Sequence, residues 1–181
     1  MNQATNQTVA QIKLRAWQET DLPFLMRLRN DVALQARLLA TARGSDEDAV
    51  RAWLMRRTEG AGRIFQVIAD RVNGDPIGYL QADLSDGQAD GWSFGICVDD
   101  PFQGSGRGTS ALIALEDELA RHFGARSLTL EVDRANERAV RCYKRLGYEE
   151  CEAAPRQVMV CDQPREVIVM AKLLAPTESR P

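Results

Sequence analysis

The sequence predicts one domain of the α/β class (mixed α+β), in which a central mixed, mostly antiparallel sheet of six to seven strands is flanked by about four helices. Two observations lead to this prediction. Residues 64–98 hold three short strand patterns separated by turn signals, which is typical of antiparallel hairpins. After residue 98, helical and strand patterns alternate instead, so the chain is not a regular βαβ repeat.

The first third of the chain predicts one strand followed by two helices. Apolar and polar residues alternate over residues 11–17, as in a half-buried strand. A helix begins at residues 20–23, with Pro23 in its first turn. A second helix begins where Ser45 and Asp48 are spaced like a capping box. Its expected buried residues are Val50, Trp53 and Leu54.

The remaining elements follow from apolar spacing and from glycines that end helices. Turns are expected at Asn73-Gly74 and Asp86-Gly87, and helix ends at Gly124 and Gly147. In chain order, the expected elements are strands at residues 64–69, 76–82 and 92–98, a helix at 109–123, a strand at 127–132, a helix at 136–146, and strands at 148–151, 158–161 and 166–174.

Composition and charge narrow the class of protein. The chain has 181 residues, 44% of them apolar, which suits a globular domain over residues 10–175 with flexible tails at 1–9 and 176–181. With 23 basic and 26 acidic residues, nothing favours nucleic acid or a membrane surface as partner. No signal peptide or membrane span is recognisable. We therefore expect a cytoplasmic enzyme or binding domain, a monomer or homodimer.

Cysteine and histidine usage argues against metal or histidine chemistry. The four cysteines have no C-x-x-C spacing and no companion histidine cluster, so reduced thiols and no metal site are expected. The single histidine, His122, lies at a helix end just before Gly124, where a cation is favourable. His122 is therefore interpreted as structural.

A glycine-rich turn between a strand and a long helix is the most informative segment. Gly104, Gly106 and Gly108 let backbone N–H groups converge, and the helix that follows adds unpaired donors and positive potential. This combination suits a phosphate or pyrophosphate, to which Arg107 could add a charged contact. No lysine follows the last glycine as in a P-loop, and G-x-G-x-G is not the dinucleotide fingerprint.

Two motifs in this region resemble those of the GNAT N-acetyltransferase superfamily. Gln103, Gly106 and Gly108 match its acetyl-CoA signature R/Q-x-x-G-x-G/A. Residues 136–148 resemble its second motif, N-x-x-A-x-x-x-Y-x-x-x-G-[FY], through Asn136, Ala139, Tyr143, Gly147 and Tyr148. The resemblance covers about residues 92–148 in the family's order, and implies a GNAT-like fold.

The resemblance implies acetyl-CoA as cosubstrate and assigns residues to it. The turn amides would hold the pyrophosphate, the central strand would pair with the pantetheine arm, and the Val98 N–H would face the oxyanion. Tyr143 would be the catalytic acid beside the sulfur. The implied cofactor-binding residues are Ile96, Cys97, Val98, Gln103, Gly104, Ser105, Gly106, Arg107, Gly108, Thr109 and Asn136.

The expected function is acetyl transfer from acetyl-CoA to a primary amine by direct attack in a ternary complex. The acceptor could be a protein N-terminus or a small amine such as an amino-sugar nucleotide, and a non-catalytic acyl-CoA-binding module is the alternative from another class. Many family members place a glutamate on the central strand, but residues 91–95 read GWSFG. No general base stands out, because Asp83, Asp90 and Glu131 are candidates whose simpler interpretation is a surface carboxylate, and an ordered water chain is an equal alternative.

The acceptor wall is expected around residues 28–31 and 36–44. Arg29, Arg37 and Arg43 in these stretches could meet an acidic small molecule, although surface arginines are the default interpretation. The basic residues near the second motif form a solvated face from which one or two could contact the CoA 3′-phosphate. They are Arg134, Arg138, Arg141, Lys144 and Arg145.

Overall fold

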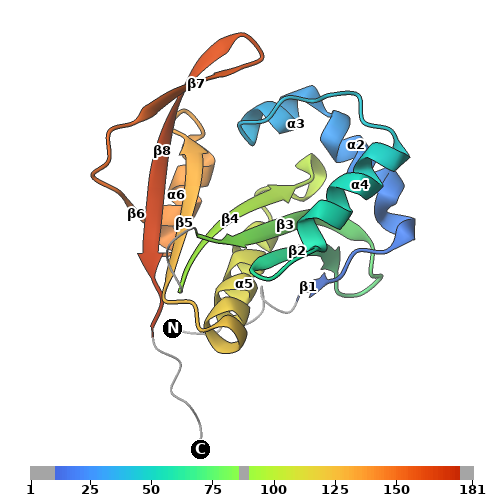
Figure 1. Cartoon of the computed structure of the whole chain (residues 1–181), viewed down its shortest axis with the longest axis horizontal. Coiled ribbons are helices and arrows are strands. Elements are labelled where there is room, and N and C mark those ends of the chain that lie inside the picture. Colours follow the sequence, from blue (N-terminus) through green and yellow to red (C-terminus); the bar gives the residue numbers. More distant parts are fainter. Residues whose placement is uncertain (1–10, 86–89, 176–181) are drawn as a thin grey trace, which may run out of the picture.

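The computed structural model describes residues 11–85 and 90–175, which build one eight-stranded sheet. Its strand order is β1-β2-β3-β4-β5-β8-β6, with β7 also paired to β8 (Figure 1). Only β4 and β5 are parallel neighbours, and every other pair is antiparallel. The strands are β1 (Ile12–Arg15), β2 (Arg63–Asp70), β3 (Pro76–Leu84), β4 (Gly91–Val98), β5 (Ser127–Asp133), β6 (Glu149–Glu150), β7 (Arg156–Val160) and β8 (Gln163–Leu173).

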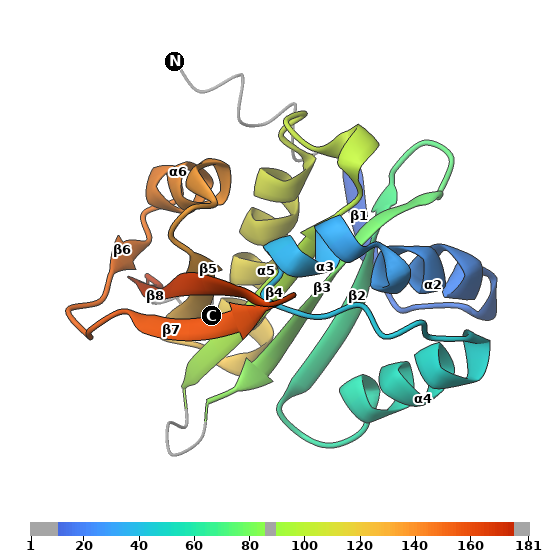
Figure 2. The same cartoon turned by 90° about the horizontal axis from the view of Figure 1, so that it is seen from above.

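Helices cover both faces of the sheet and bury two apolar cores. One core lies under α5 and α6, and the other under α2, α3 and α4. Figure 2 shows α5 and α6 on the side of the sheet opposite α4. The helices are α2 (Leu22–Asn30), α3 (Val32–Arg37), α4 (Glu47–Thr58), α5 (Arg107–Phe123) and α6 (Glu137–Arg145), with 3₁₀ turns η1 (Glu19–Asp21) and η2 (Asp100–Phe102).

The predicted fold class is confirmed, with differences in count. The described residues hold eight strands, where eight strand segments were expected along the chain but only six to seven in the sheet, and five α-helices instead of about four. The added helix, α3, has only six residues, so its apolar spacing is too short to stand out in the sequence. The expected Asp86-Gly87 turn and both expected tails lie outside the described residues.

The predicted start of α4 needs a correction. Asp46, not Ser45, is the N-cap, and its carboxylate accepts a 2.8 Å hydrogen bond from the Ala49 N–H. The Ser45 backbone is bonded to the Asn30 side chain through both its N–H and its carbonyl. Because that amide bridge sets the position of Ser45, the cap moves one residue along the chain. Val50, Trp53 and Leu54 are buried as predicted.

The sheet opens between its two parallel strands. Pairing of β4 with β5 covers Gly91↔Ser127 to Ser93↔Thr129 and then stops, although β4 continues to Val98 and β5 to Asp133. On their other edges, β4 stays paired with β3 and β5 with β8. The second half of β4 therefore has one free edge, and Figure 1 shows the two strands diverging there.

Candidate functional site

A cavity of about 760 Å³ occupies the opening between β4 and β5. One end is formed by the glycine turn and α6, and we call it the donor end after the expectation that acetyl-CoA binds there. It includes Ile96, Val98, Gln103, Gly104, Gly106, Gly108, Thr109, Asn136, Arg138 and Tyr143. The opposite end, here the acceptor end, is formed from α2, α3, α4 and β3. It includes Arg29, Leu34, Gln35, Arg37, Trp53, Arg57, Tyr79 and Gln81.

The glycine turn takes the conformation that the sequence predicts. Gly104 and Gly106 have φ of 78° and 82°, the left-handed region that residues with a Cβ rarely adopt. Gly106 is the N-cap of the 17-residue helix α5, whose first turn carries no acidic residue. An ideal Cβ on Gly108 would lie 3.4 Å from Cγ2 of Val98, so turn and strand are in contact. The N-terminus of α5 thus offers backbone donors and positive potential at the cavity.

The free edge of β4 is built by alternate residues. The Asp99 N–H donates to the Ile77 carbonyl on β3 at 3.0 Å, and Cys97 points the same way by strand alternation. The polar backbone groups of Ile96 and Val98 therefore face the opening. The Val98 carbonyl accepts a 2.6 Å hydrogen bond from Gln103 Nε2, which leaves its N–H as the group directed at the cavity.

Three predicted cofactor-binding residues direct their side chains elsewhere. The Cys97 side chain is buried in the core under α2 to α4, and burial raises the pKa of its thiol to about 12. The Ser105 hydroxyl donates to the Phe102 carbonyl at 2.5 Å. The Arg107 guanidinium pairs with Asp70 at 3.0 Å and stacks on the Phe102 ring. Ser105 and Arg107 do not line the cavity, whereas every other predicted site residue does.

The two motif residues of the second helix lie along one wall of the cavity. Asn136 is the N-cap of α6 and accepts a 3.3 Å hydrogen bond from the Ala139 N–H. Tyr143 packs edge-to-face against Phe94 and Tyr148, with ring centroids 6.2 and 6.0 Å away. Burial raises the pKa of Tyr143 above its ordinary value near 10. The phenol therefore stays protonated at neutral pH and can act as a donor.

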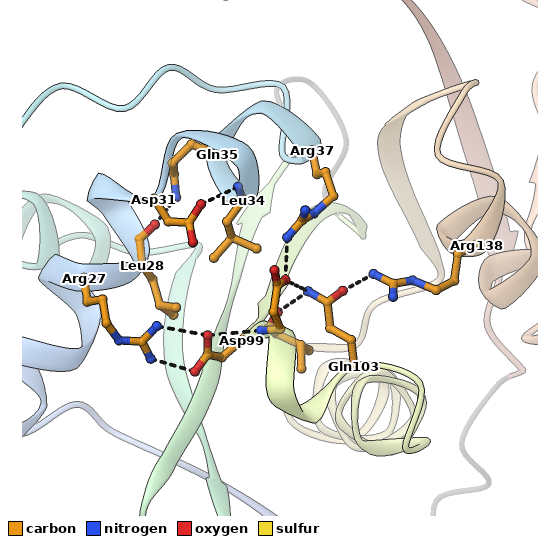
Figure 3. A network of polar contacts seen from close by, with 11 residues as sticks. Arg27, Leu28, Asp31, Leu34, Gln35, Arg37, Asp99, Gln103 and Arg138 are labelled. Atoms are coloured by element: carbon orange, nitrogen blue, oxygen red, sulfur yellow. Dashed lines mark hydrogen bonds and ion pairs between the residues drawn. The ribbon is translucent and has the colours of Figure 1, made fainter.

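A chain of polar contacts links the two ends of the cavity (Figure 3). Arg37 on α3 pairs with Asp100, which accepts a 2.8 Å hydrogen bond from Gln103 Nε2. Arg138 on α6 donates from the other side to the side-chain amide oxygen Oε1 of Gln103. Arg27 makes a bidentate ion pair with Asp99, with N–O distances of 2.6 and 3.1 Å (Figure 3). The end of β4 is therefore tied to α2, α3 and α6.

The carboxylates considered as bases occupy different surroundings. Glu131 lines the cavity from β5, two residues past the last pair with β4, and is bonded to Arg156 at 2.6 Å. Asp83 does not line the cavity and pairs with Arg57 at 2.9 Å. Asp90 is exposed, before β4, and does not line it either. Glu131 is thus the carboxylate that a bound acceptor could meet.

Several acceptor-end residues were missed by sequence reasoning. Trp53, Arg57, Tyr79 and Gln81 line the cavity, and Arg29 stacks on Trp53 with its Cζ 4.3 Å from the ring centroid. Polar residues within strand or helix patterns, such as Gln81 in β3, are the only local signal for these positions. Arg43, which the sequence suggested, is exposed and does not line the cavity.

The basic residues of the second motif differ in their surroundings. Lys144 is exposed and lies outside the cavity lining. Arg134 pairs with Glu150 and Glu166, and Arg141 with Glu137. Arg138 and Arg145 instead line the cavity. These two are the motif's candidates for contacts to a phosphate.

Among the described helices, none is long and apolar enough to cross a bilayer. Within residues 11–85 and 90–175, His, Cys, Asp and Glu form no group of three or more that could hold a metal ion. The four cysteines are free thiols.

An open strand edge that leads to a helix N-terminus suits an extended cofactor that ends in phosphates. Comparison with known protein families identifies the class of protein. The model of the Acetyltransferase (GNAT) family matches residues 22–148, so this chain belongs to the GNAT family and the predicted resemblance is confirmed. An uncharacterised N-acetyltransferase of Methanocaldococcus jannaschii is 36% identical over 105 residues. That alignment covers 55% of this chain and 44% of the relative.

Solved structures share the fold at low identity. The spermidine N-acetyltransferase of Vibrio cholerae, in complex with CoA and spermine, has a TM-score of 0.82 at 19% identity. The comparison covers 91% of this chain and 96% of that one. The same enzyme in complex with manganese ions gives a TM-score of 0.75 at 19% identity, over 92% and 95% of the two chains. At this identity the likeness establishes the fold alone.

Proposed function

We propose that the protein transfers an acetyl group from acetyl-CoA to a primary amine by direct attack within a ternary complex. The observation that carries the proposal is the continuity of the cavity. It runs from the α5 N-terminus along the free edge of β4, past Tyr143, to a polar acceptor end. Donor and acceptor can therefore meet beside a group able to assist the leaving thiolate.

The donor end fits the parts of acetyl-CoA in order. The pyrophosphate sits against the turn amides from Gln103 to Thr109, where the helix potential favours an anion. The pantetheine amides pair with Ile96 and Val98 as an added strand. Arg138, which contacts Gln103 beside the turn, moves from that side chain onto a phosphate when the cofactor binds.

The reaction forms one C–N bond and breaks one C–S bond. The neutral amine attacks the thioester carbon, and the Val98 N–H donates to the oxyanion that develops. As the intermediate collapses, the phenol of Tyr143 donates a hydrogen bond to the departing sulfur. The pKa of Tyr143 is raised and lies above that of a thiol, which is about 8.5. Tyr143 is therefore better suited to donate a hydrogen bond to the sulfur than to transfer its proton before the C–S bond breaks.

We assign the proton of the attacking amine to Glu131. The carboxylate extends from β5 at the opening, where family members often use a residue of the central strand and this chain has Gly95. The Cys97 thiol is unsuited to an acyl-enzyme step because burial raises its pKa to about 12 and favours the inert thiol. Direct transfer is therefore the mechanism that these residues support.

Thermal unfolding with acetyl-CoA tests the donor site. At a hundredfold excess over Kd, binding stabilises the fold by about 2.7 kcal/mol, which raises Tm by about 5–10 °C for a domain of this size. Pantetheine, which lacks the pyrophosphate, should give no comparable shift. An unchanged Tm with millimolar acetyl-CoA would remove the basis of the proposal.

Release of CoA in the presence of amines separates the enzyme from a non-catalytic acyl-CoA-binding module. An enzyme releases free thiol at a rate that saturates with the amine, whereas a binding module is stabilised by acetyl-CoA without amine-dependent release. A protein N-terminus and an amino-sugar nucleotide are the two acceptor types to be compared first. Mass spectrometry of the product confirms the new amide.

A further inference from the structure

The acceptor end of the cavity carries a positive charge that neighbouring carboxylates do not balance. Three arginines line this end, and two of them are matched, because Arg37 pairs with Asp100 and Arg57 with Asp83. Within residues 11–85 and 90–175, no carboxylate pairs with Arg29, and its buried Nε has no hydrogen-bond partner. One guanidinium is therefore left with an unmet charge at the acceptor end.

Arg29 is held in a way that suits an anion. Its guanidinium lies over the ring of Trp53, with Cζ 4.3 Å from the centroid. Burial lowers the pKa of Arg29, and the nearby charges of Arg56, Arg43 and Arg57 lower it further. An arginine nevertheless stays ionised, so this partly buried charge is kept without a partner at a cost in free energy. A carboxylate or phosphate is the group that relieves that cost, and it can be bound by the planar fork.

A second buried polar atom at the same end also lacks a partner. Gln81 lines the cavity from β3, and its Oε1 makes no hydrogen bond to any described residue. Gln81 is two residues from Tyr79, which packs edge-to-face on Trp53 at 5.4 Å and so lies beside Arg29. Buried polar atoms are nearly always paired in proteins. A ligand with an anionic group and an N–H or O–H donor would satisfy both atoms.

The charges at this end disfavour a polyamine. Glu131 is the only carboxylate among the cavity-lining residues that the structure describes, and it is already paired with Arg156. A polyamine would bring further ammonium groups toward Arg29, Arg37 and Arg57, where like charges repel. A polyamine like the one bound by the Vibrio cholerae enzyme is therefore not the acceptor that we expect for this chain.

We infer that the acceptor is a primary amine that also carries a carboxylate or a phosphate, with the anionic group on Arg29 and a donor on Gln81. The inference rests on the proposed function, since it names the acceptor class of the same site. Carboxylate and phosphate share the recognition chemistry, and the experiment separates them. The amine is then directed toward the thioester while the anion stays at the far end of the cavity.

Matched pairs of amines test the inference in steady-state thiol-release assays with acetyl-CoA. 2-Aminoethyl phosphate is compared with ethanolamine, and β-alanine with β-alaninamide, so that each pair differs in the anion. Spermidine is the polycationic comparison. We expect at least a tenfold higher kcat/KM for the anionic member of one pair, and that pair identifies the anion. Equal or faster turnover of the neutral members, or of spermidine, overturns the inference.

Variants of Arg29 locate the effect. Arg29→Gln should remove the preference for the anionic amine by raising its KM at least tenfold, while the KM for acetyl-CoA stays unchanged and reports a folded protein. Arg29→Lys, which keeps the charge, should retain part of the preference. Arg71→Gln is the matched control, since Arg71 is exposed and lies outside the cavity lining. A preference that survives Arg29→Gln overturns the assignment.

Binding decides the case in which no amine of the panel is acetylated. Protein saturated with CoA is then heated with each anionic amine and with its neutral partner. A rise in Tm for an anionic amine that is lost in Arg29→Gln supports the inference, and no rise for any of them overturns it. The acetyl-CoA shift of the proposed function is measured separately, so failure of the donor site and failure of the acceptor assignment are distinguished.

Discussion

The two ends of the cavity are built from different parts of the chain. The donor end takes its backbone groups from one stretch of sequence, the end of β4, the glycine turn and the start of α5, and α6 adds side chains such as Tyr143. The acceptor end uses side chains from α2, α3, α4 and β3, which are separated by up to about fifty residues. Backbone recognition suits a donor that is constant, whereas side chains can be exchanged without rebuilding the sheet. The difference indicates that substrate choice resides at the acceptor end.

The ends are nevertheless mechanically joined. Arg27 holds Asp99 at the end of β4 from α2, and Arg37 holds Asp100 from α3. Asp99 is buried and also accepts a 3.0 Å hydrogen bond from the Asp100 N–H, so it caps η2. Substitutions that separate donor from acceptor effects must leave these four residues intact.

The largest effect is expected for Glu131→Gln. Loss of a general base lowers kcat/KM for the amine by about 10²–10⁴-fold. The loss should shrink at high pH, where more of the amine is already neutral, and acetyl-CoA affinity should not change. Steady-state kinetics from pH 7 to 10 measure both quantities.

Asp117→Asn is the control for Glu131→Gln. Both changes remove one carboxylate and break one pair to an arginine, but Asp117 lies on α5 outside the cavity lining. A rate that falls equally in the two variants, or a Glu131→Gln variant with normal activity, would assign the proton to solvent instead.

Tyr143→Phe should have the next largest effect. The substitution keeps the ring that packs on Phe94 and Tyr148 but removes the donor to the leaving sulfur, so kcat falls by up to about 10²-fold. Folding and acetyl-CoA affinity should change little. Because the pKa of Tyr143 is raised above 10, wild-type activity should not decline between pH 7 and 10 through loss of its proton.

Tyr148→Phe provides the comparison on the same wall. Its hydroxyl donates to Glu116 at 2.9 Å, so the change costs stability, about 1 kcal/mol, without removing a cavity donor. A higher acetyl-CoA KM with unchanged kcat in Tyr143→Phe would make Tyr143 a binding residue. No change in either would make it a packing aromatic.

The donor end was predictable because its signal is local. Positive-φ glycines must be glycine, the α5 start must follow the turn, and Asn136 and Tyr143 must be seven apart to share a helix face. These constraints fix both residue type and spacing. The direction in which side chains leave the turn is set by distant partners instead. Arg107 bonds Asp70 of β2, which no spacing within the motif reveals.

The acceptor end was predictable only in outline. The sequence suggested arginines at 29, 37 and 43, and the structure places the first two at the cavity and the third in solvent. The difference between them is tertiary, because Arg29 is set by its stack on Trp53 of α4 and Arg37 by its pair with Asp100. The start of α4 was misplaced for the same reason, because its position depends on the contact of Asn30 with Ser45.

The smallest effect is expected for Gly108→Ala, which tests the donor end by itself. Gly108 lies in α5, and its φ is not in the left-handed region, so alanine fits the backbone and improves helix propensity. Gly106 is a poorer position for this test, because its φ of 82° strains any residue with a Cβ. The new methyl meets Val98 Cγ2 at 3.4 Å, beside the turn that we propose holds the pyrophosphate.

We expect Gly108→Ala to raise the KM for acetyl-CoA about tenfold, which corresponds to about 1.4 kcal/mol of binding free energy. The KM for the acceptor and the preference among amines should not change. The close neighbours of the added atom include no acceptor-end residue. Ser105→Ala is the control, since its hydroxyl serves the Phe102 carbonyl outside the cavity lining. If Gly108→Ala instead changes the order of preferred amines, the two ends do not recognise their substrates independently, and the contrast between backbone-built donor and side-chain-built acceptor ends fails.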